Sequence, residues 1–418
     1  MYIRRAIEPY ILRAEKSFKA VLITGARQTG KSTTLRHLFP QMKYVPIDDP
    51  FVEEQAGENP HMFMMLNPPP VIYDEVQRTP QLFRFIKLQC DASDQKGQFL
   101  LSGSQPLELM ENAAESLSGR VCVMELSGLS MREMQGSPYS KPFVPTLDYV
   151  NERKETAKPF ANVWEMIHRG SYPQLQDPAI AWDAFYGSYV KTYLERDVRQ
   201  LSAVQDLNDF RKFMVAVAAR TGQMLNLTNI ADEISKSLTT VSRWISILES
   251  SGIIYLLEPY TSSVLKRAIK TPKVYFRDTG LAAYLTRWLT PDTLANGAMS
   301  GAFFETFVIS EILKSYANCG IDYRYCVSYY RGRDKGKVLK DGTEIERERE
   351  IDLIIEQNGI LYPIEIKKGV HVSADQTAAF TVLDKIPEKR RGTGAVICLC
   401  PQPGVLRENI LQLPLWYI

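Results

Sequence analysis

The sequence has few cysteines, almost no net charge and no long apolar run. Its 50 lysines and arginines balance 48 aspartates and glutamates, which leaves a net charge of +2 and no overall sign of a polyanion-binding protein. No run approaches the roughly 18 apolar residues that a membrane span needs, and the first residues mix charge into their apolar stretch, unlike a signal peptide. The six cysteines form no Cys-x-x-Cys pair and have no histidines at zinc-site spacing, so buried free thiols are expected. We therefore expect a soluble, reduced, cytoplasmic protein with no membrane contact.

The chain does contain ample material for several folded units. With 418 residues, of which 45% are hydrophobic and 23% charged, it is globular in composition and long enough for two to three domains. In residues 1–130, short β-branched runs alternate with helical patterns, which predicts a parallel sheet covered by helices on both faces. The predicted strands are Ala20–Thr24, Tyr44–Ile47, Val71–Tyr73, Phe99–Leu101 and Val121–Leu126.

The first of these strands leads into a phosphate-loop motif, G-x-x-x-x-G-K-S, and a helical pattern follows. Glycines let such a loop curl so that its backbone N–H groups face phosphate oxygens, and the start of the helix adds partial positive charge. We expect Lys31 to reach the β- and γ-phosphates of ATP and Ser32 to bind Mg²⁺. The predicted cofactor-binding residues are Gly25, Ala26, Arg27, Gln28, Thr29, Gly30, Lys31, Ser32 and Thr33.

The third strand ends in two carboxylates, Asp74 and Glu75. Asp74 suits the Mg²⁺ shell, and Glu75 is placed to polarise a water molecule for attack on the γ-phosphate. The fourth strand ends in Ser102-Gly103-Ser104, where Ser102 or Ser104 senses the γ-phosphate or orients water, unless the segment is only a turn. Lys31, Glu75, Ser102 and Arg120 are therefore the predicted catalytic residues.

Arg120, which precedes the fifth strand, has two interpretations. It is an arginine finger that points at the γ-phosphate of a neighbouring subunit in an oligomer, or it forms a surface salt bridge. The chain has no Asn-Lys-x-Asp motif for reading guanine, which favours ATP over GTP.

These motifs resemble the bacterial and archaeal AAA-like P-loop ATPases whose C-terminal half is a domain of unknown function. The resemblance implies an ATPase core followed by a nuclease-like domain, and the chain departs from the family pattern at Ser102, where a threonine is expected. The segments that carry it are Gly25–Ser32, Val71–Arg78, Phe99–Ser104, Leu117–Arg120, Gly170–Leu175, Tyr193–Val198, Val274–Leu285, Gly301–Val308 and the stretches EIDLII and IEIKKG.

Residues 227–257 have the pattern of a winged helix-turn-helix module: two short helices and a strand or wing. The second helix points Thr240 and Arg243 away from its apolar stripe. A basic stretch follows, and its cations would suit contacts with DNA phosphates. The candidate DNA-contacting residues are Thr240, Arg243, Lys266, Arg267 and Lys270; the alternative is a solvated basic face on a module that only couples the nucleotide site to a partner.

Two apolar segments near the C-terminus flank Asn358-Gly359, a strong hairpin signal. If Gln357 pairs with Ile360, then Asp352 lies opposite Glu365, and Lys367 shares that face. Facing carboxylates repel unless a divalent cation or a shared proton relieves them. The set resembles the restriction-endonuclease-like fold, in which Asp352, Glu365 and Lys367 occupy the motif positions and Glu305 matches an additional acidic position; such a site hydrolyses phosphodiesters with a second divalent metal at Asp352 and Glu365. The alternative is an inactive relic, and Pro363 favours a sheet edge at this strand.

We thus predict an α/β fold with four regions: a P-loop ATPase domain (1–135), a linker and helical lid (136–205), a winged helix module (206–290) and a restriction-endonuclease-like domain (291–418). Residues 135–160 are rich in proline, serine and lysine and are expected to form a boundary or surface loop. One hypothesis is an ATPase that drives or gates a transaction on DNA. A second is a nucleotide-dependent switch or scaffold that binds protein partners, and a third, a simple transcription regulator, leaves the ATP site without a purpose.

Overall fold

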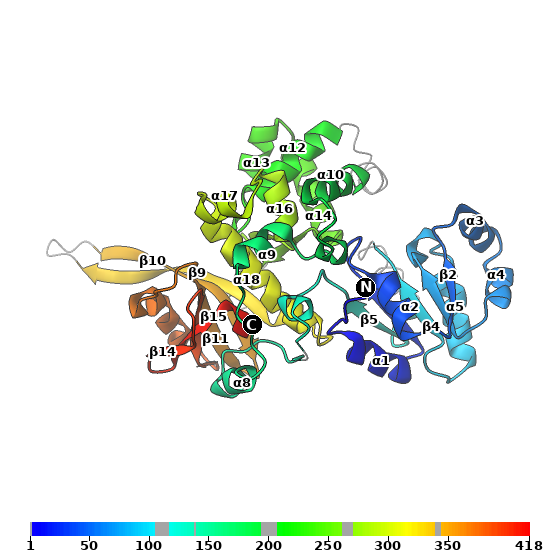
Figure 1. Ribbon diagram of the computed structural model, residues 1–418, viewed down its shortest axis with the longest axis horizontal. Helices are drawn as coiled ribbons and strands as arrows, with labels where there is room; N and C mark the ends of the chain where they lie inside the picture. The colour runs from blue at the N-terminus through cyan, green and yellow to red at the C-terminus, as the bar shows by residue number, and fades with distance from the viewer. Residues whose placement is uncertain (1, 105–116, 138, 194–206, 261–270, 339–343) are drawn as a thin grey trace.

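The structure is a computed structural model that describes residues 2–104, 117–137, 139–193, 207–260, 271–338 and 344–418. Its first region is built on a five-stranded, all-parallel sheet in the order β2-β3-β4-β1-β5 (Figure 1). The five strands predicted from the sequence are confirmed, with small differences at their ends. They are β1 (Ala20–Thr24), β2 (Lys43–Pro46), β3 (Val71–Asp74), β4 (Phe99–Ser102) and β5 (Val121–Glu125).

Helices cover both faces of this sheet, which explains why its strands read as almost continuous apolar runs. On one face, Val21 and Ile23 of β1 pack in a core with residues of α1 (Glu8–Ser17) and α2 (Lys31–Leu38). On the other face, Ala20 and Leu22 pack in a core with residues of three helices. These are α3 (Pro50–Glu58), α4 (Pro60–Leu66) and α5 (Leu82–Ala92).

The middle of the chain is mostly helical and contains a small antiparallel sheet of order β6-β8-β7. Its strands are β6 (Gln223–Met224), β7 (Ile254–Leu257) and β8 (Lys273–Phe276). The helices are α7 (Met131–Met134), α8 (Leu147–Arg153), α9 (Val163–Arg169), α10 (Trp182–Tyr193), α12 (Leu207–Ala218), α13 (Leu227–Ile234), α14 (Leu238–Ser250), α16 (Thr279–Leu285) and α17 (Pro291–Asn296).

The prediction of a surface loop over residues 135–160 is wrong for the segment around α8. Phe143 and Tyr149 of this segment are buried, and Arg153 is almost fully buried. The Arg153 guanidinium donates hydrogen bonds to the carbonyl oxygens of Tyr417 (3.1 Å) and Trp416 (2.7 Å). The segment therefore packs against the C-terminal residues. Its prolines and lysines suggested a loop, although it contains a packed helix.

The last region starts with the buried helix α18 (Ser300–Ala317) and continues into a mixed sheet in the order β14-β15-β13-β11-β10-β9. Strands β11, β13 and β15 are parallel, whereas β9, β10 and β11 pair antiparallel. The strands on this path are β9 (Val327–Val338), β10 (Glu344–Gln357), β11 (Ile360–Ile366), β13 (Gly394–Cys398), β14 (Gly404–Arg407) and β15 (Ile410–Pro414).

The prediction that Pro363 marks a sheet edge is wrong, because β11 lies between β10 and β13. On the side away from β10, β11 pairs first with the two-residue strand β12 (Arg390–Arg391) and then with β13, which joins it at Ile364. In an antiparallel pair, successive residues direct their backbone N–H groups alternately toward and away from the partner strand. The nitrogen of Pro363 points away from β10, at the place where β12 has ended and β13 has not yet begun. A central strand tolerates the missing N–H because no partner needs it there.

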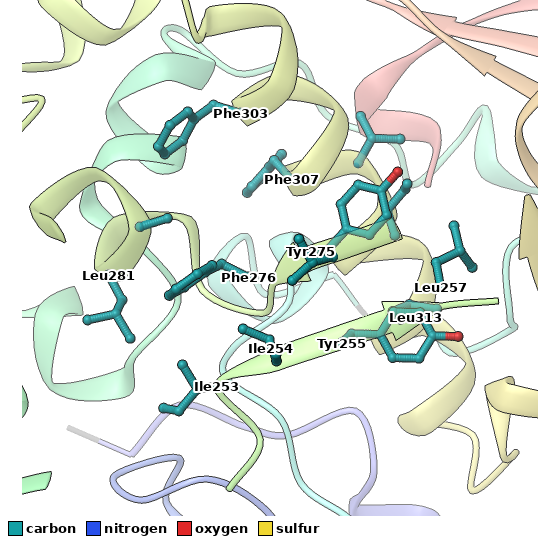
Figure 2. Packing of buried hydrophobic residues seen from close by; sticks show 14 of the residues in the cluster. Ile253, Ile254, Tyr255, Leu257, Tyr275, Phe276, Leu281, Phe303, Phe307 and Leu313 are labelled. Carbon is teal, nitrogen blue, oxygen red and sulfur yellow. The ribbon is translucent and has the colours of Figure 1, made fainter. Parts of the chain in front are cut away.

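The middle and last regions share one hydrophobic core (Figure 2). Tyr255 of β7 and Phe276 of β8 belong to the same buried cluster as Phe303, Phe307 and Leu313 of α18, and Figure 2 shows all five. Helix α18 therefore belongs as much to the middle region as to the sheet that follows it. No helix within the described ranges is long and apolar enough to span a bilayer.

Candidate functional site

The phosphate loop lies between the end of β1 and the start of α2. Gly25 has a φ of +141°, and a Cβ there would come within 2.3 Å of the carbonyl oxygen of Leu126, so only glycine fits. Gly30 has a φ of +95° and directly precedes α2, which begins at Lys31. The first N–H groups of α2 have no partner within the helix, so they are available to bind phosphate oxygens at the end of the loop.

A cavity of about 600 Å³ opens beside the loop. The Lys31 ammonium, on a side chain that is only 5% exposed, donates to the carbonyl oxygens of Gly25 and Ala26 at 3.0 and 2.8 Å. The loop thus holds its lysine against its own backbone and leaves room for a phosphate chain. The residues that line the cavity are Arg27, Gln28, Gly30, Lys31, Ser32, Thr33, Glu75, Pro173, Gln174 and Thr192.

Asp74, at the carboxyl end of β3, accepts hydrogen bonds from hydroxyl groups of α2, β2 and β4. It accepts hydrogen bonds from Ser32 at 2.8 Å, from Tyr44 at 2.5 Å and from Ser102. Burial, and then the hydrogen bond to Asp74, raise the pKa of Tyr44 well above its usual range. Sequence reasoning found Ser32, Asp74 and Ser102 but missed Tyr44, which is brought there only by the pairing of β2 with β3.

The same oxygen set fits a magnesium ion. Mg²⁺ prefers carboxylate and hydroxyl oxygens together with phosphate oxygens. Ser32 lines the cavity, and its hydroxyl contacts the buried Asp74 carboxylate directly. The residues present therefore fit an ATP–Mg²⁺ complex.

Glu75 lies at the edge of the cavity in a left-handed backbone conformation, with φ of +55°. Its carboxylate accepts hydrogen bonds from the Ser104 hydroxyl, at 2.9 Å, and from the Gln77 amide. The position suits an acceptor for a proton from water, and the partners Ser104 and Gln77 fix the orientation of the carboxylate. Gln77 had no signal in the sequence.

The amino-terminal segment of the chain also contacts the phosphate loop. Arg5, which is buried, donates to the Thr29 carbonyl oxygen at 2.8 Å and pairs with Glu133 at 3.0 Å, so the amino-terminal segment supports the loop.

The predicted catalytic residue Arg120 lies outside the site. It directly precedes β5, and since the strands are parallel this is the edge of the sheet opposite the loop. There it pairs with Asp91, so within one chain it forms the surface salt bridge and does not join the site.

The candidate DNA-contacting residues are only partly covered by the structure. Arg243 is exposed on α14, opposite the buried Val241, Ile245 and Leu248, as the pattern predicted. Thr240 is half-buried, and its hydroxyl lies 2.8 Å from that of Ser237 at the start of the helix. The other three residues, Lys266, Arg267 and Lys270, lie outside the described residues.

The carboxylate hairpin has the predicted register. Gln357 pairs with Ile360 and Leu353 with Ile364, so Asp352 and Glu365 occupy the next facing positions. Lys367 lies 2.6 Å from Glu365 and 3.6 Å from Asp352. Burial, and then the charge of Asp352, raise the pKa of Glu365 to about 8. The second carboxylate oxygen of Glu365, Oε2, is buried without a hydrogen-bond partner among the described residues.

A lysine of the basic stretch that was expected to contact phosphates lies instead beside this hairpin. Lys273 of β8 is 4% exposed and pairs with Glu350 at 2.6 Å and with Glu305 at 3.3 Å. Glu305 also accepts a hydrogen bond from Tyr275 at 2.6 Å, and burial, then the charge of Asp352, raise its pKa. Within the described residues, no three histidine, cysteine, aspartate or glutamate side chains come together as a metal ion would require. The predicted second metal at Asp352 and Glu365 is therefore not shown.

Comparison with known proteins assigns the first region. Residues 17–135 match the family model described as an AAA domain, and residues 161–292 and 300–418 match two models that are each described as a domain of unknown function (DUF8612 and DUF4143). Uncharacterized proteins of Mycobacterium tuberculosis and Mycobacterium bovis are each 26% identical over 390 residues, which is 91% of this chain and 77% of theirs.

Two solved structures are similar to this chain over part of its length. A Walker-type ATPase of Pyrococcus abyssi has a TM-score of 0.43 at 13% identity and covers 68% of this chain and 96% of its own. The RuvB Holliday junction branch migration motor of Thermotoga maritima has a TM-score of 0.30 at 14% identity and covers 60% of this chain and 88% of its own. Residues 17–135 thus match an AAA domain model and carry a phosphate loop on a parallel sheet, the arrangement with which P-loop ATPases bind ATP and Mg²⁺.

Proposed function

We propose that this chain is a Mg²⁺-dependent ATPase whose nucleotide cycle is coupled to binding or processing of DNA. The observation that carries the ATPase proposal is that Ser32, which lines the open cavity together with Lys31, donates to the buried Asp74 carboxylate, which Ser102 also contacts. Separate strands and the loop supply these groups, so the fold holds them together before any ligand arrives. Such preorganisation is what phosphoryl transfer requires.

Each residue has a role in this proposal. The Lys31 ammonium balances the charge of the phosphate chain, while Ser32 and Asp74 hold the metal ion. The bound Mg²⁺ supplies charge neutralisation as the phosphate bond breaks. Glu75 accepts the proton of a water molecule, and Ser104 keeps its carboxylate oriented. Ser102 positions Asp74 through its hydrogen bond.

The coupling to DNA is supported by the order of elements in the middle region. Helix α12, strand β6, helices α13 and α14, and strands β7 and β8 follow one another in the order of a winged helix. The exposed face of α14 presents Ser242, Arg243 and Ser246. One cation with several hydroxyls suits contact with a groove and its phosphates.

The coupling is tested by the rate of phosphate release with and without double-stranded DNA, at two salt concentrations. We expect DNA to raise the rate, and higher salt to reduce the effect because phosphate contacts release counterions. An unchanged rate at both salt concentrations removes the coupling and leaves the ATPase. Arg243→Ala, with Lys212→Ala as a matched surface control, assigns the effect to α14.

A second candidate function is a nucleotide-dependent switch that binds protein partners, with the C-terminal cluster as a structural element. The contacts of Lys273 and Lys367 favour it, because these lysines already occupy carboxylate oxygens of Glu305 and Glu365 that a nuclease would use for metal. A nuclease assay in Mg²⁺ or Mn²⁺, with and without ATP, decides between the two. Cleavage by the wild type that is lost in Glu365→Ala and in Asp352→Ala supports DNA processing at Asp352, Glu365 and Lys367, with a second divalent metal; absence of cleavage supports the switch.

A further inference from the structure

The cavity beside the phosphate loop has one wall that comes from outside the ATPase domain. The 3₁₀ turn Pro173–Gln176 contributes Pro173 and Gln174 to its lining. The ring of Pro173 comes within 3.8 Å of the position that a Cβ on Gly30 would take, so the turn lies directly against the phosphate loop. A segment of the middle region, about 140 residues along the chain from the loop, thus faces the place where phosphates would bind.

This turn is held firmly on the side away from the cavity. The Ser171 carbonyl oxygen accepts a hydrogen bond from the N–H of Leu129 at 2.7 Å, which ties the turn to the ATPase domain. The Ser171 N–H and hydroxyl both donate to the Asp278 carboxylate, at 2.6 and 2.9 Å. Asp278 in turn caps α16 by accepting from the N–H of Leu281 at 2.8 Å. The turn therefore connects the phosphate loop to the start of a helix in the middle region.

Within this fixed turn, Gln174 is the exposed residue. Tyr172 and Leu175 are buried on either side of it, and the Arg169 guanidinium closes the turn by donating to the Leu175 carbonyl oxygen at 2.5 Å. Among the described residues, no protein group forms a hydrogen bond with the Gln174 side chain. Its amide has two N–H donors and no charge, which suits a contact with a phosphate oxygen that Lys31 and Mg²⁺ already neutralise.

We propose that Gln174 is a nucleotide-contacting residue that donates a hydrogen bond to the terminal phosphate of ATP. The inference rests on the proposed ATPase function. It adds a residue through which binding of the γ-phosphate affects the position of elements in the middle region. Glu75 and Lys31, the residues assigned to the terminal phosphate, line the same cavity as Gln174. Because Ser171 and Asp278 hold the turn, a contact made at Gln174 is carried to α16 without a flexible linker.

The test measures the dissociation constants of the full chain for MgATP and MgADP by calorimetry. Gln174→Ala is expected to weaken MgATP binding about tenfold, the value of one hydrogen bond to a charged group, and to change MgADP binding less than about twofold. Gln174→Glu is expected to weaken MgATP further, because it adds a negative charge beside the phosphates. The matched control is Gln176→Ala, in the same turn, whose side chain donates to the Tyr172 carbonyl oxygen at 3.4 Å and does not line the cavity.

The outcomes separate this inference from the function on which it rests. If Gln174→Ala and Gln174→Glu bind MgATP as the wild type does while Lys31→Ala loses it, Gln174 has no contact and the ATPase proposal stands. Equal weakening of MgATP and MgADP also overturns the inference, because the contact would then not involve the terminal phosphate. If the wild type binds neither nucleotide, both proposals fail. Gln174 is exposed, so its variants should fold, and unchanged thermal unfolding of each variant checks this.

Discussion

The nucleotide site and the carboxylate cluster use the same residue types in opposite ways. In the nucleotide site, Lys31 donates to backbone carbonyl oxygens and Asp74 accepts from hydroxyl groups, so these two residues do not form an ion pair with each other. In the second, Lys273 and Lys367 pair directly with glutamates. An acid held by hydroxyl groups can exchange those contacts for a metal ion, whereas a cluster whose lysines already contact its carboxylates contributes to folding.

The largest effect is expected at the nucleotide site. Lys31→Ala removes the only lysine that lines the cavity within the described residues and should lower ATP turnover at least a hundredfold, measured by phosphate release. The matched control is Lys16→Ala on the exposed surface of α1, which should retain wild-type turnover. Full turnover in Lys31→Ala would contradict the assignment of the loop.

In the carboxylate cluster, the largest expected effect is on stability rather than on chemistry. Lys273→Met keeps the length of the side chain but leaves Glu305 and Glu350 without their cation, and we expect a loss of about 3 kcal/mol in the free energy of unfolding. Urea titration measures it, with Lys212→Met as an exposed control. A variant as stable as the wild type would mean that Lys273 does not serve to neutralise the cluster.

The pH dependence of stability sharpens the same comparison. The folded chain holds the Glu365 proton up to a pKa of about 8, against 4.5 in the unfolded chain, so unfolding releases the proton between these values. Stability therefore falls as the pH rises through this window, by roughly 2–4 kcal/mol. Glu365→Gln, which stays neutral, should lose this dependence. Urea titrations of both proteins between pH 5 and 9 check it, and parallel curves would show that Glu365 is ionised throughout.

The smallest effect is expected for Arg120, which belongs to neither site within one chain. Arg120→Ala breaks an exposed pair with Asp91 and should leave both stability and ATP turnover close to those of the wild type. A tenfold loss of turnover at unchanged MgATP affinity would instead support an arginine finger that acts on a neighbouring subunit. Turnover measured as a function of protein concentration distinguishes the two.

What could be predicted from the sequence was local. The phosphate loop, the strands of the parallel sheet and the register across Asn358-Gly359 depend on residues close together in the chain, and the structure bears them out. The places of Tyr44 and Gln174, and the pairing of Lys273 with the carboxylate cluster, could not be predicted, because each depends on pairing or packing with distant segments.

Two errors have the same origin. Pro363 was expected at an edge because proline lacks an N–H, but the sequence does not show that the neighbouring partner changes at that point. The composition around α8 suggested a loop, yet Arg153 is fixed by carbonyl groups more than 260 residues away. In both cases the deciding contacts are long-range.

The most direct test of this account is a calorimetric titration of the full-length wild-type chain with MgATP. The account predicts saturable binding at one site per chain, dependent on Mg²⁺. The absence of any heat of binding would contradict the claim that the loop and its neighbouring strands form a site for ATP and Mg²⁺. An affinity for ATP that is the same with and without Mg²⁺, and the same in Asp74→Ala, would also contradict it.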